Sequence, residues 1–192
     1  STKDSVKMVR IAKKDGVSVS AEVCPHHFAM TEDEIAGDDA NYKMNPPLRS
    51  AADVEALVDG LADGTMEAIS TDHAPHGEEE KKQSIAKAPF GIVGSETAYA
   101  LSVTHLVKTG KLTPLQLVEK MSTNPCRILS VPGGTLSVGA PADITIADMD
   151  SEYVIDKNTF LSKGKNTPFD GAKVNGRVYY TIVGGNIVYQ YE

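Results

Sequence analysis

The spacing of apolar residues changes once along the chain, near residue 132, and this change limits the possible folds more than any other feature. Before that point, stretches with helical spacing alternate with short apolar runs that have the spacing of strands. This order predicts βα units around a parallel sheet, although two strands are fewer than a stable sheet needs. The predicted helices cover residues 4–14, 51–61, 95–108, 113–122 and 124–129, and the predicted strands cover residues 17–23 and 66–70.

Local signals mark the ends of several of these helices. Gly16 follows the first helix and favours its termination there. Ser50 is a typical N-cap for the helix that begins at residue 51. Thr113 and Pro114 form an N-cap followed by proline at the first helical position.

After Pro132 the sequence has the character of a small all-β unit. Short apolar runs separated by glycine-rich turns predict strands there, and two of them flank Gly184-Gly185-Asn186 as a β-hairpin would. The predicted strands cover residues 143–148, 153–155, 178–183 and 187–189. We therefore predict an α/β chain with a βα part over residues 1–132 and a small β part over residues 133–192.

Composition narrows the classes of protein to which the chain can belong. The formal net charge is −7 with no basic patch, which argues against a nucleic-acid partner. No apolar run approaches the ~20 residues of a membrane span, and no secretory signal opens the chain. The two cysteines are far apart and suit a cytoplasmic protein with reduced thiols. The charged run over residues 78–82 is most simply a solvated segment.

The segment Asp72-His73-Ala74-Pro75-His76 directly follows a predicted strand. In βα architectures the carboxyl ends of the strands carry the catalytic groups, because the loops there converge. An aspartate and two histidines in one short segment could bind a metal ion or transfer protons, and in an extended segment Asp72 and His76 would share a side. Alternatively, Asp72 caps the following turn while the histidines pack, and spacing alone does not decide between the two.

The other polar strand end is Cys24-Pro25-His26-His27, which suggests a metal site. Adjacent side chains of an extended segment point apart, however, so both histidines would rarely reach one ion. A structural role for the pair is therefore the favoured interpretation. A third candidate is Asn45, whose amide precedes two prolines that restrict the backbone and could hold it in one orientation towards a ligand. A simple rigid loop explains that segment equally well.

Taken together, these segments resemble one family. Their order is similar to that in bacterial dihydroorotases of the amidohydrolase superfamily, and the resemblance extends over the whole chain. The segments that carry it are Ser1-Thr2-Lys3, Glu22-Val23-Cys24-Pro25-His26-His27, Asn45-Pro46-Pro47-Leu48, Thr71-Asp72-His73-Ala74-Pro75-His76, Pro89-Phe90-Gly91, Asn124-Pro125, the stretch over residues 134–144, Asn166-Thr167-Pro168-Phe169 and the stretch over residues 171–176.

The resemblance implies the C-terminal portion of a TIM barrel, with its last two βα units and further helices, followed by part of a β-sandwich. It implies the reversible, zinc-dependent cyclisation of N-carbamoyl-L-aspartate to L-dihydroorotate in de novo pyrimidine biosynthesis. By the same resemblance Asp72 is the catalytic base and a metal ligand. Asn45, His76, Phe90 and Gly91 then contact the substrate.

The resemblance also implies what this chain would not contain. In the family, the remaining ligands of a pair of zinc ions precede the segment that matches Ser1, and His26 and His27 match no ligand. We therefore expect the chain to be the truncated C-terminal half of the enzyme, to be inactive alone, and to associate with the missing N-terminal half or with itself. A homo-oligomer, and an assembly with aspartate carbamoyltransferase, are further expectations.

Two alternatives to this function remain open. The first is a hydantoinase or allantoinase, which would open a different cyclic amide. The second is a non-catalytic, dihydroorotase-like scaffold subunit. The presence of both Asp72 and His76 argues against the scaffold, because a protein that has lost its chemistry has no chemical reason to keep them.

Overall fold

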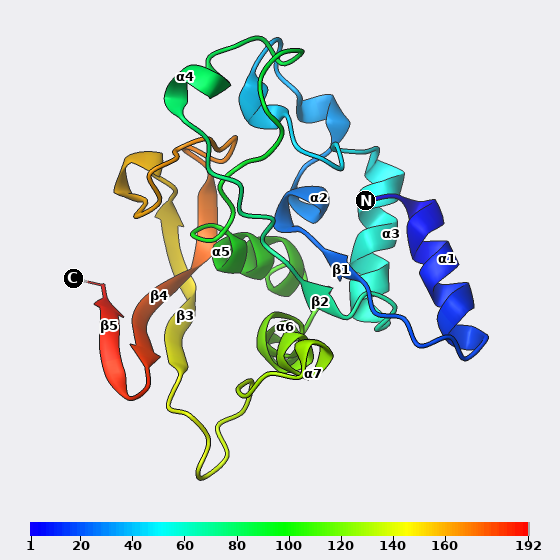
Figure 1. The fold of residues 1–192 in the computed structure, drawn as a ribbon, viewed down its shortest axis with the longest axis vertical. Coiled ribbons are helices and arrows are strands. Elements are labelled where there is room, and N and C mark those ends of the chain that lie inside the picture. The colour runs from blue at the N-terminus through cyan, green and yellow to red at the C-terminus, as the bar shows by residue number, and fades with distance from the viewer. Residues whose placement is uncertain (192) are drawn as a thin grey trace.

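The computed structural model describes residues 1–191. Helices surround a short parallel pair of strands, and an antiparallel sheet follows towards the C-terminus (Figure 1). The α-helices are α1 (Lys3–Lys14), α2 (Pro25–Ala29), α3 (Ala51–Ala62), α4 (Glu78–Lys81), α5 (Ala98–Ser102), α6 (Pro114–Val118) and α7 (Asn124–Leu129). The strands are β1 (Glu22–Val23), β2 (Ala68–Ile69), β3 (Ile144–Val154), β4 (Lys173–Val183) and β5 (Asn186–Gln190). Short 3-10 turns are η1 (Glu32–Glu34), η2 (Ala40–Tyr42) and η5 (Lys157–Thr159), and π-helical turns are η3 (Val103–Val107) and η4 (Glu119–Thr123).

Helices α1 and α3 form where the sequence predicts them. The side chains of Thr2 and Ser50 each accept a hydrogen bond from a backbone amide of the first helical turn, which satisfies a donor that the helix itself cannot pair. The two helices lie side by side (Figure 1). A Cβ atom at Gly60 would lie 3.0 Å from Cγ1 of Val6, so glycine permits their close approach.

Strands β1 and β2 pair in parallel, as predicted, but they are shorter than predicted. Each has only two residues, whereas the sequence patterns cover residues 17–23 and 66–70. Val17 and Val19 remain 55% and 36% exposed, and residues 17–20 are not part of any strand. The alternation of apolar residues is present, but among residues 1–191 no neighbouring strand pairs with that stretch.

Two continuous helical runs follow. Helix α5 continues into the π-helical turn η3, and the two cover most of the predicted helix over residues 95–108. Helices α6 and α7 are joined through η4, where the sequence predicts two separate helices. Pro125 cannot donate a backbone hydrogen bond, and the wider turn of η4 lets the helix continue past it. Within residues 1–191, no helix combines the length and apolarity needed to cross a membrane.

The C-terminal strands form one antiparallel sheet in the order β3-β4-β5. The turn between β4 and β5 places Gly184 and Gly185 at φ angles of 55° and 82°, which confirms the predicted glycine hairpin. The two strands predicted over residues 143–148 and 153–155 are one strand, β3, whose register against β4 shifts between Asp148 and Glu152. The described residues contain no second sheet facing this one, so a β-sandwich is not formed by residues 1–191 alone.

The buried apolar residues form two clusters. The first joins α1, α3 and the two helical runs around Leu61, Val103 and Leu106, which are each 0% exposed. The second joins both sides of residue 132, with Leu101 of α5 packed in one cluster with Val174 of β4. The α/β part therefore shares a core with the C-terminal sheet, and the boundary at residue 132 stays a prediction from the sequence pattern.

The first cluster should dominate the stability of the chain. We expect Leu106→Ala to lower the free energy of unfolding by about 2–5 kcal/mol, because it leaves a cavity at a fully buried position. The matched control is Leu136→Ala, at a position that is 80% exposed, which should change stability by about 0.5 kcal/mol or less. Urea denaturation followed by circular dichroism measures both. Equal stability of the two variants would contradict this description of the core.

Candidate active site at the ends of the parallel strands

The polar segments that the sequence analysis identified lie together at one edge of the parallel pair. Strand β1 ends at Val23 and leads into Cys24 and α2, whereas β2 ends at Ile69 and leads to Asp72. Because the strands are parallel and paired directly, their carboxyl ends meet at the same edge. Ligands bind at such an edge in open α/β folds, which makes it the candidate active site.

Asp72 has an unusual backbone conformation and an accessible carboxylate. Its φ angle is 48°, in the left-handed region that non-glycine residues rarely adopt, and its side chain is 42% exposed. The carboxylate accepts no hydrogen bond within residues 1–191, and its Oδ2 lies 4.0 Å from Nε2 of His26. Since Asp72 is not extended, the alternation expected to put Asp72 and His76 on one side does not apply. Strained residues of this kind gather at functional sites.

His76 lies beside Phe90 and Gly91, and all three residues were predicted to contact the substrate. Its Nε2 is 2.8 Å from the carbonyl oxygen of Phe90, and its Nδ1 is 3.9 Å from a carboxylate oxygen of Glu80. A Cβ atom at Gly91, whose φ is 122°, would lie 2.4 Å from Cβ of Ala74, so glycine is required for this close packing. The structure therefore brings three of the predicted substrate residues together.

Asn166 ties this arrangement together, and the sequence analysis gave it no role. Its side chain is buried, with Nδ2 donating to the carbonyls of Ala74 and Gly91 and Oδ1 accepting from the amide of His76. The residue comes from the loop between β3 and β4, about ninety positions along the chain from His76. Only its place in the segment Asn166-Thr167-Pro168-Phe169, one of those that carry the family resemblance, could have drawn attention to it.

Lys81 is the second residue that the sequence analysis missed. Its side chain is buried, and Nζ donates to the carbonyls of Pro89 and Gly91 at 3.1 and 2.9 Å and to that of Lys43 at 3.4 Å. Burial, and then the charge of Lys43, lower the pKa of Lys81. The charged run over residues 78–82 is thus solvated except at Lys81, whose ammonium group holds the loop that carries Phe90 and Gly91.

A cavity of about 390 Å³ opens next to His76. His76, Asn166 and five lysines, but only one glutamate, are among the residues that line it. Several of these ammonium groups are already paired, since Lys81 donates to backbone carbonyls and Lys82 and Lys157 form ion pairs with carboxylates. The surplus of lysine over glutamate still favours anionic over cationic ligands in this cavity.

Asn45 is exposed and lies in a segment that is held at two points. Nε2 of His27 in α2 lies 2.8 Å from the carbonyl oxygen of Pro46, and the amide of Gly91 donates to the carbonyl of Lys43 at 2.9 Å. The Asn45–Pro46 peptide bond is cis. The segment that carries Asn45 is thus joined both to His27 and to Gly91, and the substrate role of Asn45 stays a prediction.

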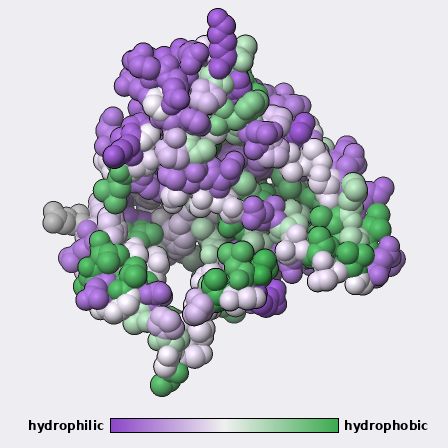
Figure 2. Space-filling model, in the orientation of Figure 1, coloured by the Kyte–Doolittle hydropathy of each residue, from purple (hydrophilic) through white to green (hydrophobic). Residues whose placement is uncertain are grey.

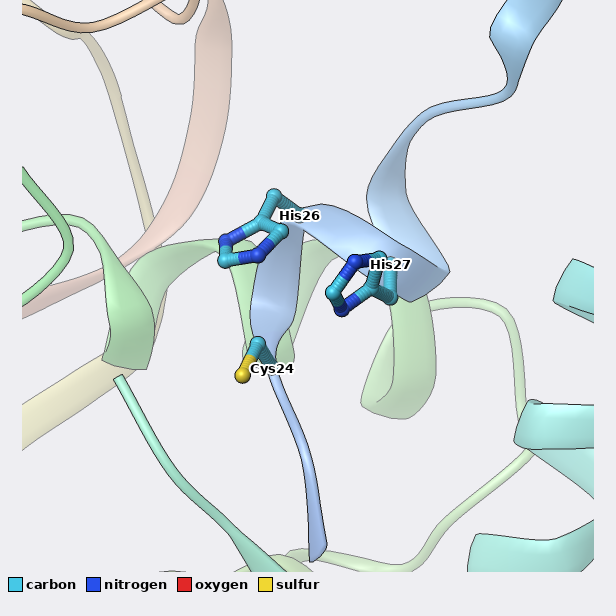
Figure 3. A group of neighbouring side chains, drawn as sticks. All are labelled: Cys24, His26 and His27. Carbon is cyan, nitrogen blue, oxygen red and sulfur yellow. The ribbon is translucent and has the colours of Figure 1, made fainter. Parts of the chain in front are cut away.

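Cys24, His26 and His27 form a compact group (Figure 3). The argument that the two histidines point apart is wrong, because residues 25–29 form helix α2 and not an extended segment. The ring centroids lie 4.3 Å apart, and the sulfur and one nitrogen of each ring all lie within 4.8 Å of one another. Nε2 of His26 is buried and has no hydrogen-bond partner among the described residues.

The protonation states in this group follow from its burial. Burial, and then the charge of His27, lower the pKa of His26 to about 3, so this ring is neutral at physiological pH. Burial also lowers the pKa of His27. The pKa of the Cys24 thiol rises to about 12, first because of burial and then because of the carboxylates of Asp72 and Glu22. Two neutral imidazoles and a protonated thiol therefore stand beside Asp72.

The chain is similar in sequence to a known protein family. The sequence profile of the amidohydrolase family matches residues 2–188. The chain is 57% identical over 190 residues to the dihydroorotase of Bacillus licheniformis and 54% identical to that of Bacillus subtilis. Each match covers 99% of this chain but 44% of the relative, so the chain spans less than half the length of these curated relatives.

Solved structures give the same picture for the fold. The L-hydantoinase from Arthrobacter aurescens superimposes with a TM-score of 0.90 at 33% identity, over 99% of this chain and 43% of that structure. A dihydropyrimidinase from Brevibacillus agri superimposes with a TM-score of 0.92 at 26% identity, over the same shares of the two chains. The architecture of residues 1–191 is thus that of a fragment of an α/β amidohydrolase.

Proposed function

The chain belongs to the amidohydrolase family, and on this basis we propose that it is the C-terminal share of a cytoplasmic dihydroorotase. The reaction opens the ring of L-dihydroorotate to N-carbamoyl-L-aspartate, and its reverse closes the ring in pyrimidine synthesis. The observation that carries this proposal is the 53–57% identity to curated dihydroorotases over almost the whole chain. In the proposed enzyme, this chain would form the last βα units of a barrel and part of a β-sandwich.

The surface supports the presence of further protein. Apolar surface gathers along the lower part of the molecule, below a polar upper part (Figure 2). Leu129, Leu136 and Val138 are among the exposed large apolar residues, with at least 69% of each accessible. Exposed apolar patches favour contacts with other protein surfaces. The proposed N-terminal share is the first candidate to cover them, and a homo-oligomer or a complex with aspartate carbamoyltransferase are further ones.

Asp72 is the proposed general base. Its carboxylate is accessible and free of hydrogen bonds within residues 1–191, so it is able to act as one ligand of the zinc that this family's chemistry implies. Bound zinc would lower the pKa of a water molecule to ~7. Asp72 would accept the proton of the attacking water as the water oxygen adds to the ring carbonyl, and would donate that proton to the ring nitrogen as the C–N bond breaks.

His76 and the loop around Phe90 and Gly91 are the proposed binding site for the substrate carboxylate. A carboxylate there would take the place of Glu80 beside the ring of His76. The lysines around the adjacent cavity favour the same charge. Asn45 would contact the ring of the substrate. A second candidate function is that of a hydantoinase. The similarity of this fold to the Arthrobacter aurescens L-hydantoinase favours it, although the sequence identity between the two chains is only 33%.

Substrate preference tests the proposed function in the full-length protein that contains this chain. Dihydrouracil has the ring of dihydroorotate without its carboxylate, so it isolates the carboxylate site. We expect kcat/KM for dihydroorotate to exceed that for dihydrouracil by at least about 100-fold, because a charged hydrogen-bonding site rejects a substrate that leaves it unpaired. Equal or greater turnover of dihydrouracil or hydantoin would favour the hydantoinase alternative.

The variant His76→Ala tests whether His76 contributes to the preference for dihydroorotate over dihydrouracil. The variant should raise KM for dihydroorotate by about tenfold or more, through the loss of a charged hydrogen bond, and should change dihydrouracil turnover little. Dihydrouracil is thus the internal control for the fold and the chemical step. An unchanged KM for dihydroorotate would remove His76 from the proposed binding site.

A further inference from the structure

Cys24, His26 and His27 place three potential metal-binding atoms close together at the end of β1 (Figure 3). Cys24 is the N-cap of α2, and Pro25 at the first helical position turns the chain so that both histidines follow in the same turn. The three donor atoms lie within 4.8 Å of one another. Zinc bonds of ~2.0–2.3 Å place ligand atoms roughly 3.5 Å apart, so side-chain rotations that move the donors by about 1 Å complete the geometry.

His26 has a ring nitrogen that nothing else uses. The side chain is 1% exposed, and its Nε2 has no hydrogen-bond partner among residues 1–191. The carboxylate oxygen of Asp72 is 4.0 Å away, which is too far for a hydrogen bond. Buried polar atoms in folded proteins are almost always paired, so an unpaired one calls for an explanation. A bound ion between His26, Cys24 and His27 provides that partner.

His27 is arranged as metal-bound histidines usually are. Its Nε2 lies 2.8 Å from the carbonyl oxygen of Pro46, which can only accept, so Nε2 carries the hydrogen. The lone pair of the ring is therefore on Nδ1. Histidine ligands typically donate their other ring nitrogen to a backbone carbonyl, which fixes the ring for coordination.

The thiol of Cys24 is the donor that a bound cation would change most. Burial, and then the carboxylates of Asp72 and Glu22, raise the pKa of this thiol, whereas the positive N-terminus acts in the opposite direction. The N-terminus and Arg49 also act on His27 as positive charges. A divalent ion would reverse the effect on the thiol, because a coordinated thiol loses its proton. One thiolate and two neutral imidazoles form a donor set that suits zinc and its analogue cobalt.

We propose that Cys24, His26 and His27 form a binding site for a divalent ion of the zinc type. The site uses residues of this chain alone. It therefore stands or falls independently of the proposed dihydroorotase activity, and it can be tested without an activity assay.

The test is a cobalt titration of the reduced, metal-free 192-residue chain in the absence of oxygen. Binding at this site should produce a thiolate-to-cobalt charge-transfer band that saturates at one ion per chain and disappears when zinc is added. Cys24→Ser should abolish the band. The matched control is Cys126→Ser, which removes the other cysteine, in α7, and should leave the band unchanged.

The histidines give a second, independent measurement. His26→Gln and His27→Gln should each weaken cobalt binding by about tenfold or more, because each removes one of few ligands. Circular dichroism identifies variants that fail to fold. If His26→Gln does not fold, the cobalt affinity of His27→Gln tests the proposal in its place. Absence of the band in the folded wild-type chain would overturn the proposal, and so would its persistence in Cys24→Ser.

Discussion

The 192-residue chain alone is expected to open no detectable dihydroorotate, even with zinc added. Asp72 is the one residue of this chain that we propose as a ligand of the catalytic metal centre, and zinc affinity depends on several preorganised ligands. The chain also spans only 44% of the length of the dihydroorotases it matches. We therefore expect its rate to equal that of the buffer control.

The measurement needs a preparation of defined composition. Intact mass spectrometry should show the 192-residue chain alone, and release of N-carbamoyl-aspartate should be followed by chromatography. The full-length protein, assayed with the same zinc, is the positive control. Turnover by the pure chain at a rate near that of the full-length protein would show that this chain contains a complete catalytic site, contrary to the account.

The helices were the most predictable part of the fold. The helical spacing over residues 4–14 and 51–61 coincides with an N-cap, and α1 and α3 form there. Helix α3 buries one face, whereas Val6 is the buried residue of α1 and Met8 and Ile11 stay exposed. Local interactions suffice to define such elements. The π-helical turn η4, by contrast, joins two predicted helices, because its wider backbone geometry tolerates Pro125 in a way that helix propensity does not describe.

The strands were harder to predict, because a strand exists only where a partner pairs with it. Residues 17–20 have strand spacing but no pairing partner among residues 1–191, so β1 is confined to Glu22–Val23. Strand β3 was predicted as two pieces, since the residues between them lack the apolar alternation. Pairing with the long strand β4 makes them continuous through a change of register.

The candidate site was predictable where residues close in sequence form it. Asp72 and His76 follow a strand directly, and the ordered motifs identified Phe90 and Gly91. Asn166 could not be assigned, because its contacts with His76 and Gly91 come from a distant loop. The grouping of the two histidines was also missed, since Pro25 begins a helix where the sequence pattern favoured an extended segment.

Asp72→Asn should lower kcat for dihydroorotate by at least about 100-fold in the full-length protein. General base catalysis contributes ~10²–10⁴-fold, and an amide cannot accept the proton of the attacking water. The substitution keeps the size of the side chain at a position whose carboxylate is accessible and pairs with nothing more closely than His26 at 4.0 Å. It should therefore leave the fold and its stability nearly unchanged.

The control for this variant is Asp59→Asn, which removes an exposed carboxylate on α3 and should retain normal turnover. Circular dichroism and zinc content should be measured for both proteins, because loss of zinc would also lower the rate. Zinc retained at the wild-type level in Asp72→Asn would assign the loss of rate to the base itself.

The most direct test of the account is thus the ratio of kcat values of wild-type protein and Asp72→Asn, measured with dihydroorotate at saturating concentration. We expect a ratio of at least about 100, with Asp59→Asn near the wild-type value. A folded Asp72→Asn variant whose kcat lies within about tenfold of the wild-type value would contradict the central claim that Asp72 is the catalytic base.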